Sequence, residues 1–279
     1  MMKQAPRRSL LVLLLLAAGV AAAQKRPYLA LGDSIPFGFD PTVPIGDILG
    51  YHGYPQFVAG ALALSLANAS CPGETSASFL NVAVPDDGCH EYRAANGPLF
   101  VLYSGLNQSQ LNFAVTFLRA NPTTRLVTIT LGGDDLLLLK QACSTQANPA
   151  ACELEGLGNV LADYARNLTE IYLAIRFGAR YKGPIVAANY FSPDYTSALD
   201  DIAIASLNSV TLSVTAAFGG KIADVFSAFQ AASVAGGGLP CSPVVGLAFP
   251  NPPPLGGCNV HPTVAGQELI ANLVVDALQ

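Results

Sequence analysis

Short apolar runs alternate along the chain with longer segments in which apolar residues recur at helical spacing. Five runs predict strands, at residues 28–31, 62–67, 126–131, 185–188 and 221–225. Four segments predict amphipathic helices, at residues 108–119, 158–177, 198–217 and 263–278. Strands that alternate with helices in this way predict an α/β fold, in which helices cover both faces of a parallel sheet.

Three unusual loops follow the first three predicted strands. Ser34 follows the first strand, residues 71–75 follow the second, and residues 132–135 follow the third. Ligands of open α/β sheets bind beyond the carboxyl ends of the strands. We therefore expect these three loops to lie at one edge of the sheet and to contain the functional site.

Residues 1–23 have the pattern of a secretory signal peptide. Basic residues precede the apolar residues 10–20, and Ala23 ends a run of small residues that suits cleavage. The apolar run is shorter than the roughly 20 residues that a membrane span needs, and an uncleaved anchor is the alternative. The sequence thus predicts a secreted chain, extracellular or periplasmic. Residues 24–279 would then form a single domain without a stable membrane span.

The charge balance argues against a nucleic-acid partner. The formal net charge is −5, and it becomes −8 when the three basic residues of the leader, Lys3, Arg7 and Arg8, are removed. A chain this acidic has no basic stripe along which a nucleic acid could bind.

Six cysteines in a chain with a predicted leader indicate disulfides. They fall into three local couples: Cys71 with Cys89, Cys143 with Cys152, and Cys241 with Cys258. Other connectivities are open, but pairing within each couple is the economical interpretation because each couple brackets a loop rich in Gly, Pro, Asn or Ser. A metal site is the alternative. Neither Cys-x-x-Cys nor His-x-x-x-His spacing occurs, so we expect no metal ion.

Ser34 is a candidate nucleophile because it follows a predicted strand and precedes a turn rich in Gly and Pro. A serine hydroxyl is a weak nucleophile unless a base takes its proton. The chain has three candidate bases, His52, His90 and His261. His261 directly precedes a predicted helix whose first turn tolerates Pro262, whereas the other two lie in predicted loops. This context favours His261.

Four short motifs, in order along the chain, resemble the sequence blocks of the SGNH (GDSL) hydrolase family. Gly-Asp-Ser at residues 32–34 matches the first block, with Ile35 where leucine is usual. Gly73 within Cys-Pro-Gly-Glu-Thr matches the second and resembles a secreted, disulfide-containing bacterial branch. Gly-Gly-Asp-Asp at residues 132–135 and His-Pro at residues 261–262 resemble two later blocks, each with one departure. The resemblance covers the whole predicted mature chain.

The resemblance implies a flavodoxin-like, three-layer α/β/α sandwich with a central five-stranded parallel sheet. It also implies hydrolysis of esters without a metal ion or organic cofactor. Ser34 would be the nucleophile and His261 the general base, and the oxyanion hole would use the backbone N–H groups of Ser34 and Gly73 and the side chain of Asp134. Two neighbouring carboxylates would support these loops through hydrogen bonds: Asp33 and Asp135.

Asp134 departs from the family pattern, which has asparagine at this position. Asparagine donates an N–H group to the oxyanion, whereas an ionised aspartate only accepts hydrogen bonds. Two interpretations stay open. Either burial and the neighbouring Asp135 raise the pKa of Asp134, so that a protonated carboxyl donates, or the two backbone N–H groups act alone and the enzyme is slower.

The second departure is a missing triad acid. Cys258 stands three residues before His261, where the family has aspartate, and Asn259 stands two before it. Such an acid fixes the imidazole tautomer. Some members of the family use a Ser–His dyad in which a backbone carbonyl orients the ring, and we expect a dyad here. Three other carboxylates could supply an acid from elsewhere, although the spacing selects none of them: Asp194, Asp200 and Asp224.

These features predict a secreted serine esterase or lipase that acts, as a monomer, on a small-molecule or lipid ester. We expect the aliphatic residues 244–249 to line an acyl pocket. Residues 136–139 belong either to the core or to a wall on the lipid side, and the core is the favoured interpretation. A carbohydrate deacetylase of the same fold is the alternative enzyme, although the chain has no Trp that could stack on a sugar. A catalytically impaired fold that only binds a ligand is the alternative outside enzymes, because of Asp134 and the missing acid.

Overall fold

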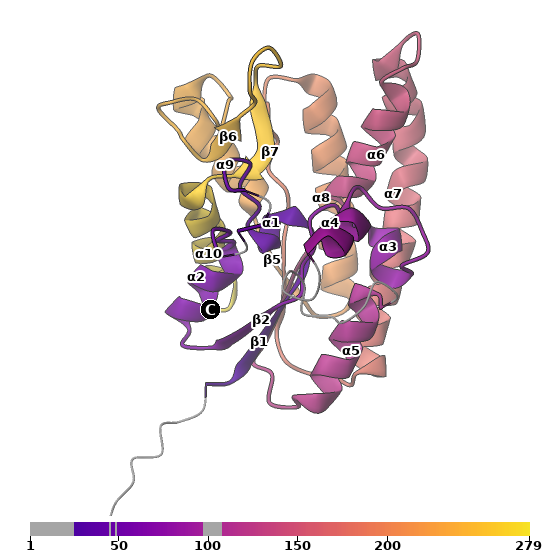
Figure 1. The fold of residues 1–279 in the computed structure, drawn as a ribbon, viewed down its shortest axis with the longest axis vertical. Helices are drawn as coiled ribbons and strands as arrows, with labels where there is room; N and C mark the ends of the chain where they lie inside the picture. Colours follow the sequence, from indigo (N-terminus) through magenta and orange to yellow (C-terminus); the bar gives the residue numbers. More distant parts are fainter. Residues whose placement is uncertain (1–24, 45, 48, 97–107) are drawn as a thin grey trace, which may run out of the picture.

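The computed structural model describes residues 25–44, 46–47, 49–96 and 108–279, and the predicted signal peptide at residues 1–23 lies outside them. Five parallel strands form the central sheet (Figure 1). In chain order they are β1 (Pro27–Gly32), β2 (Ser65–Asn68), β3 (Leu126–Thr130), β4 (Ile185–Ala188) and β5 (Lys221–Ala223). Their order across the sheet is β2-β1-β3-β4-β5, so the strand order reverses at β1. Such a reversal is where open α/β sheets bind ligands.

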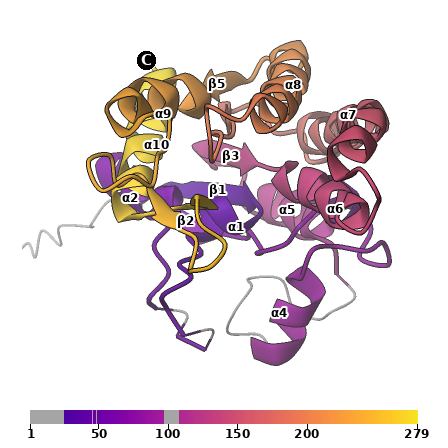
Figure 2. The same cartoon turned by 90° about the horizontal axis from the view of Figure 1, so that it is seen from above.

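Helices cover both faces of the sheet and complete three layers (Figure 2). On one face, α2 (Tyr54–Ala61) packs against α10 (Val264–Ala277), and α10 contacts β4 and β5. The other face carries α5 (Gln110–Ala120), α7 (Pro149–Leu173) and α8 (Ala198–Ala217). The predicted three-layer α/β/α sandwich with a five-stranded parallel sheet is therefore confirmed.

Shorter elements lie at the ends of the strands and around the edge of the sheet. They are α1 (Ser34–Phe37), α3 (Ser76–Leu80), α4 (Cys89–Asn96), α6 (Gly133–Cys143), α9 (Val225–Ser233) and the antiparallel strands β6 (Ala248–Pro250) and β7 (Cys258–Pro262). Within the described residues, no helix has both the length and the apolar character needed to cross a membrane.

The central strands are buried on both faces. Every residue of β3 and β4 is buried, which explains why β4 is a continuous apolar run and why the only polar residues of β3 are the two threonines Thr128 and Thr130. Buried hydroxyls find partners inside the sheet: Tyr28 Oη and Thr128 Oγ1 share a hydrogen bond of 2.7 Å. Pairing of this kind avoids the cost of an unsatisfied buried polar group.

Two predicted strand boundaries are wrong. The run at residues 62–67 begins at the C-cap of α2, and β2 occupies Ser65–Asn68. The run at residues 221–225 enters α9, because the side chain of Asp224 accepts the Ser227 backbone N–H group and so caps that helix. A continuous apolar run does not mark the point where a strand gives way to a helix.

Three disulfides hold the loops that surround the sheet. They join Cys71 to Cys89, Cys143 to Cys152, and Cys241 to Cys258, which are the couples predicted from the sequence. The first closes the segment after β2, the second joins the end of α6 to the start of α7, and the third anchors β7. Each bridge restricts the unfolded chain and so contributes about 2–4 kcal/mol to stability.

Candidate active site

Ser34 and His261, at opposite ends of the sequence, meet at the carboxyl edge of the sheet. Ser34 is the first residue of α1, directly beyond β1, and His261 lies on β7. Ser34 Oγ and His261 Nε2 are 3.0 Å apart, which is hydrogen-bond distance. The other two histidines have partners elsewhere. His52 contacts a nearby backbone carbonyl at an exposed position, and His90 Nδ1 lies 2.6 Å from Asp86 Oδ2.

The side chain of Asn259 occupies the place of the missing acid. Its Oδ1 lies 2.6 Å from His261 Nδ1 and accepts the backbone N–H group of His261 at 3.0 Å. Asn259 Nδ2 donates to Asn251 Oδ1 at 3.3 Å, so the hydrogen-bond network identifies which end of the amide is oxygen. In this arrangement Nδ1 carries the proton and Nε2 faces the Ser34 hydroxyl.

The sequence predicts a backbone carbonyl in this orienting role, whereas the structure has a side-chain carbonyl. The reason is local geometry. Asn259 stands two residues before the histidine, and an asparagine oxygen readily bonds the backbone two residues on. The position of Asn259 two residues before His261 was therefore the feature of the sequence that could have identified its role.

Asp33 shapes the start of α1. Its Oδ1 accepts the Ile35 backbone N–H group at 3.0 Å, and its Oδ2 accepts the hydroxyl of Tyr190. Burial raises the pKa of Asp33 to about 7, while the hydrogen bond from Tyr190 acts in the opposite direction. Tyr190 follows β4, and Asn208 holds its backbone with two hydrogen bonds of 2.9 and 2.8 Å. Sequence analysis did not identify Tyr190, because no motif surrounds it.

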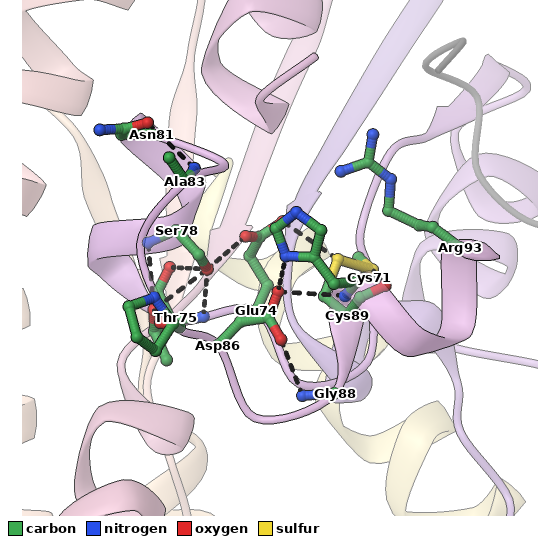
Figure 3. A network of polar contacts seen from close by, with 12 residues as sticks. Cys71, Glu74, Thr75, Ser78, Asn81, Ala83, Asp86, Gly88, Cys89 and Arg93 are labelled. Carbon is green, nitrogen blue, oxygen red and sulfur yellow. Dashed lines mark hydrogen bonds and ion pairs between the residues drawn. A yellow bond between two sulfur atoms is a disulfide. The ribbon is translucent and has the colours of Figure 1, made fainter. Parts of the chain in front are cut away.

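Gly73 lies in a tightly constrained turn after β2. Its φ is +82°, and a Cβ there would come within 2.4 Å of the backbone oxygen of Asp87, so the turn has room only for glycine. The Cys71–Cys89 disulfide closes the segment beside Glu74 (Figure 3). The backbone of Gly73 is therefore held in one conformation.

Gln110, at the start of α5, ties this segment to β1. Its Oε1 accepts the Gly32 N–H group at 2.6 Å, and its Nε2 donates to the Gly32 carbonyl at 3.0 Å. The same Nε2 donates to Glu74 Oε2 at 3.0 Å. Glu74 Oε1 in turn accepts the Ser78 hydroxyl at 2.5 Å (Figure 3). The loop that contains Gly73 is thus fixed relative to the strand that ends just before Ser34.

Asp134 is a buried carboxyl in the first turn of α6. It is 5% exposed, and within the described part of the chain its Oδ2 has no hydrogen-bond partner. Burial, and then the nearby Asp33, raise the pKa of Asp134 well above its usual value. Because an ionised carboxylate without partners is costly to bury, these observations favour a protonated side chain.

Asp135 links α6 to α3. Its two carboxylate oxygens accept the backbone N–H group and the hydroxyl of Ser76, at 2.9 and 2.6 Å. Ser76 opens the helix that follows the Gly73 turn. Asp135 therefore connects the loop after β2 with the loop after β3.

The ring of His261 is half-buried. Phe39 packs on it with a distance of 4.7 Å between the ring centroids. Burial lowers the pKa of His261 to about 4, and the more distant charge of Asp40 opposes this shift. The imidazole is consequently neutral at neutral pH, as a general base must be.

An apolar pocket opens beside Ser34, with a volume of about 880 Å³ including its open mouth. Ser34, Asp134 and Tyr190 are among the residues at its polar end. Its apolar walls come from α6, α7, α8 and the segment after β4: Leu136, Leu137, Leu139, Leu157, Phe191, Leu199, Ala203 and Ile204. Three charged residues also line the pocket: Lys140, Glu153 and Asp200. An apolar concavity with a few polar groups is typical of a small-molecule site.

The pocket corrects two expectations from the sequence. Residues 136–139, expected in the core, include three residues of the pocket wall. Residues 244–249, expected to line an acyl pocket, do not line this one, and Val244 is 73% exposed. Core and pocket wall are both apolar, so composition does not distinguish them.

One further cluster contains atoms of the kind that bind metals. The sulfurs of Cys71 and Cys89 and a carboxylate oxygen of Glu74 lie within 4.8 Å of one another. The two sulfurs are bonded to each other and so offer no thiolate to a metal. This cluster is therefore a structural bridge.

Comparison with known proteins identifies relatives of this fold. The sequence matches the GDSL-like lipase/acylhydrolase family over residues 30–269. The structure is similar to phospholipase A1 from Streptomyces albidoflavus, with 21% identity, a TM-score of 0.58, and 91% of this chain and 99% of that chain covered. It is also similar to an extracellular lipase from Streptomyces rimosus, with 22% identity, a TM-score of 0.58, and 90% and 99% covered.

An acetyl-xylooligosaccharide esterase from Geobacillus is similar as well, with 16% identity, a TM-score of 0.54, and 91% and 94% covered. No curated protein matches the chain. At these identities the structural likeness shows a shared fold.

Proposed function

Because the chain belongs to the GDSL-like lipase/acylhydrolase family, we propose that it is a secreted serine esterase or lipase that hydrolyses carboxylic esters. The observation that carries this proposal is the 3.0 Å contact between Ser34 Oγ and His261 Nε2 at the end of an apolar pocket. The three disulfides support secretion, because such bridges persist in oxidising compartments. The predicted leader at residues 1–23 would direct the export.

The reaction would proceed through an acyl-enzyme. His261 Nε2 takes the proton of Ser34 as Oγ attacks the ester carbonyl, and the protonated ring then gives that proton to the departing alcohol. His261 next deprotonates a water molecule, which attacks the acyl-Ser34 ester; the protonated ring then returns this proton to Ser34 Oγ as the C–O bond breaks and the acid is released. Asn259 would hold the ring in the correct tautomer as a neutral acceptor, so the pair acts as a dyad assisted by an amide.

The oxyanion would bind to three donors. They are the backbone N–H groups of Ser34 and Gly73 and the protonated carboxyl of Asp134. The fixed backbone of Gly73 and the unpaired Oδ2 of Asp134 support this assignment. Donors that are already in position need no reorganisation when charge develops on the carbonyl oxygen.

The pocket favours an ester with an aliphatic acyl chain over an acetylated sugar. Its walls are mainly aliphatic, whereas a sugar site usually has stacking aromatic residues. The names of two structural neighbours, a phospholipase and a lipase, also support acyl esters. The Geobacillus neighbour keeps acetylated xylooligosaccharides as the second substrate class to test.

The direct test combines turnover with covalent labelling. The chain without residues 1–23 is assayed on p-nitrophenyl esters and on acetylated xylooligosaccharides, and is treated with a serine-directed phosphonate. We expect turnover of the p-nitrophenyl esters and one phosphonate adduct, at Ser34 by mass spectrometry. A folded protein that turns over neither substrate class and forms no adduct would overturn the proposal in favour of a ligand-binding protein.

The acid side of the pH profile provides a second test. General-base catalysis needs neutral His261, and burial lowers the pKa of this group to about 4. We therefore expect kcat/KM to stay level as the pH falls from neutrality and to decline with an apparent pKa of about 4. The measurement is a pH–rate profile, with folding checked at each pH by tyrosine fluorescence and circular dichroism.

Asn259→Asp is the matched variant for this profile. A carboxylate beside Nδ1 stabilises the imidazolium form, so the decline should move to higher pH. A wild-type decline centred at the ordinary histidine pKa of 6.5 would contradict the burial of His261 as the cause.

A further inference from the structure

The apolar pocket has a defined length, because one helix runs along it. Asp134 and Lys140 both line the pocket and lie on α6. Lys140 lies six positions after Asp134 in the sequence, which corresponds to about 9 Å of helix rise. An extended acyl chain with C–C bonds near 1.5 Å covers this length with roughly six to eight carbons.

An ion pair marks the far end of this apolar length. Lys140 Nζ and Asp200 Oδ1 are 3.2 Å apart, and both residues line the pocket. The side chain of Lys140 is 56% exposed, so its charge is hydrated. An acyl chain that passed this point would displace water from two charges, which is unfavourable.

Gly156 on α7 lies behind the wall of the pocket. A Cβ at Gly156 would come within 2.5 Å of Leu139 Cδ1, and Leu139 lines the pocket. The affected atom is the end of a flexible side chain, so a methyl group at position 156 displaces Leu139 and leaves the backbone in place. The absence of a side chain at Gly156 therefore lets Leu139 keep its present position in the pocket wall.

We propose that this pocket is an acyl-chain site selective for medium-chain esters, from hexanoyl to octanoyl, and that Gly156 determines its width through Leu139. The proposal rests on the proposed ester hydrolysis, because the acyl carbonyl must lie at Ser34. Acetyl esters leave the apolar walls exposed to water. Palmitoyl esters extend beyond the ion pair of Lys140 and Asp200.

The test compares two alanine substitutions on the same helix. Gly156→Ala displaces Leu139, whereas Gly158→Ala has no neighbour within 4 Å of its new Cβ and gives the same gain in helix propensity. Values of kcat/KM are measured on p-nitrophenyl acetate, hexanoate, octanoate and palmitate. We expect wild type to prefer hexanoate or octanoate.

Gly156→Ala should lower kcat/KM on octanoate by about tenfold and leave acetate within about twofold, whereas Gly158→Ala should leave both within about twofold. Adding Leu139→Ala to Gly156→Ala should restore octanoate turnover. A wild-type preference for acetate or palmitate, or an equal loss on every ester in Gly156→Ala, would overturn the proposal.

A binding measurement separates this proposal from the proposed function. Octanoate and acetate are titrated into Ser34→Ala by calorimetry, with and without Gly156→Ala. Octanoate should bind more tightly than acetate, and Gly156→Ala should lower the affinity for octanoate by about tenfold. If octanoate binds in this way but wild type hydrolyses no ester, the hydrolytic function fails and the acyl site stands. If esters are hydrolysed without any dependence on chain length, the acyl site fails and the hydrolytic function stands.

Discussion

Ser34→Ala and His261→Ala are each expected to lower kcat for ester hydrolysis by about 10⁶-fold, and the double variant should be no slower than either single one. The reason is that the two side chains act as a unit through the 3.0 Å contact between Oγ and Nε2. Without the base, the hydroxyl keeps its proton, and without the hydroxyl, the base has no nucleophile to activate. Single-turnover and steady-state rates on p-nitrophenyl hexanoate would measure these losses.

Two controls give this result its meaning. Thermal unfolding of each variant should match wild type, because Ser34 and His261 lie at the edge of the sheet and three disulfides hold the surrounding loops. His52→Ala should keep full activity, since His52 is exposed and its ring bonds the nearby backbone carbonyl of Gly50. Losses of the two single variants that multiply in the double variant would show that Ser34 and His261 act independently, contrary to the proposed mechanism.

The alternation of apolar runs and amphipathic segments was sufficient to predict the central fold. The helix at Ala198–Ala217 coincides with its predicted boundaries, and β4 coincides with residues 185–188. The helix predicted at residues 158–177 instead begins at Pro149 and ends in a π-helical turn at Ala174–Gly178. Its start has a local cause, because Asn148 caps the helix by accepting the Ala151 backbone N–H group and Pro149 suits the first helical position. Apolar periodicity alone does not detect such a cap.

The catalytic pair was predictable because the family motifs place Ser34 and His261 beyond separate elements of one sheet edge. The contacts of Asn259 with His261 and of Tyr190 with Asp33 were not predicted, for different reasons. Asn259 acts through a local turn, but its bond to Nδ1 depends on the orientation of the ring. Tyr190 reaches Asp33 across 157 positions of the sequence, and only the packing of β4 beside β3 brings them together.

The sequence did not identify the walls of the apolar pocket, because it favoured the core for residues 136–139 over the alternative of a wall. The four leucines at residues 136–139 form one apolar run, and such a run suits a core as well as a cavity wall. Which of them face the cavity depends on how α6 packs between α7 and the sheet edge. That packing depends in turn on the Cys143–Cys152 bridge and on the contact between Gly156 and Leu139. No one-dimensional pattern contains this information.

The raised pKa of Asp134 predicts how kcat/KM changes on the alkaline side of the pH profile. Its protonated form donates to the oxyanion, and its ionised form repels it. Burial and Asp33 raise its pKa, so the donor is present at neutral pH and is lost as the pH rises through that raised pKa. Wild-type kcat/KM should therefore fall at alkaline pH.

Three variants test this assignment. Asp134→Leu should lower kcat/KM by about 10²–10³ at neutral pH, because one oxyanion donor is removed. Asp134→Asn should keep the neutral rate within about tenfold and abolish the alkaline fall, because an amide donates at every pH. Asp135→Asn should keep the fall but move it to lower pH, because the charge of Asp135 helps to raise the pKa of Asp134. If the Asp134→Asn profile superimposes on wild type at every pH, Asp134 is outside the oxyanion hole, and the backbone N–H groups of Ser34 and Gly73 bind the oxyanion without it.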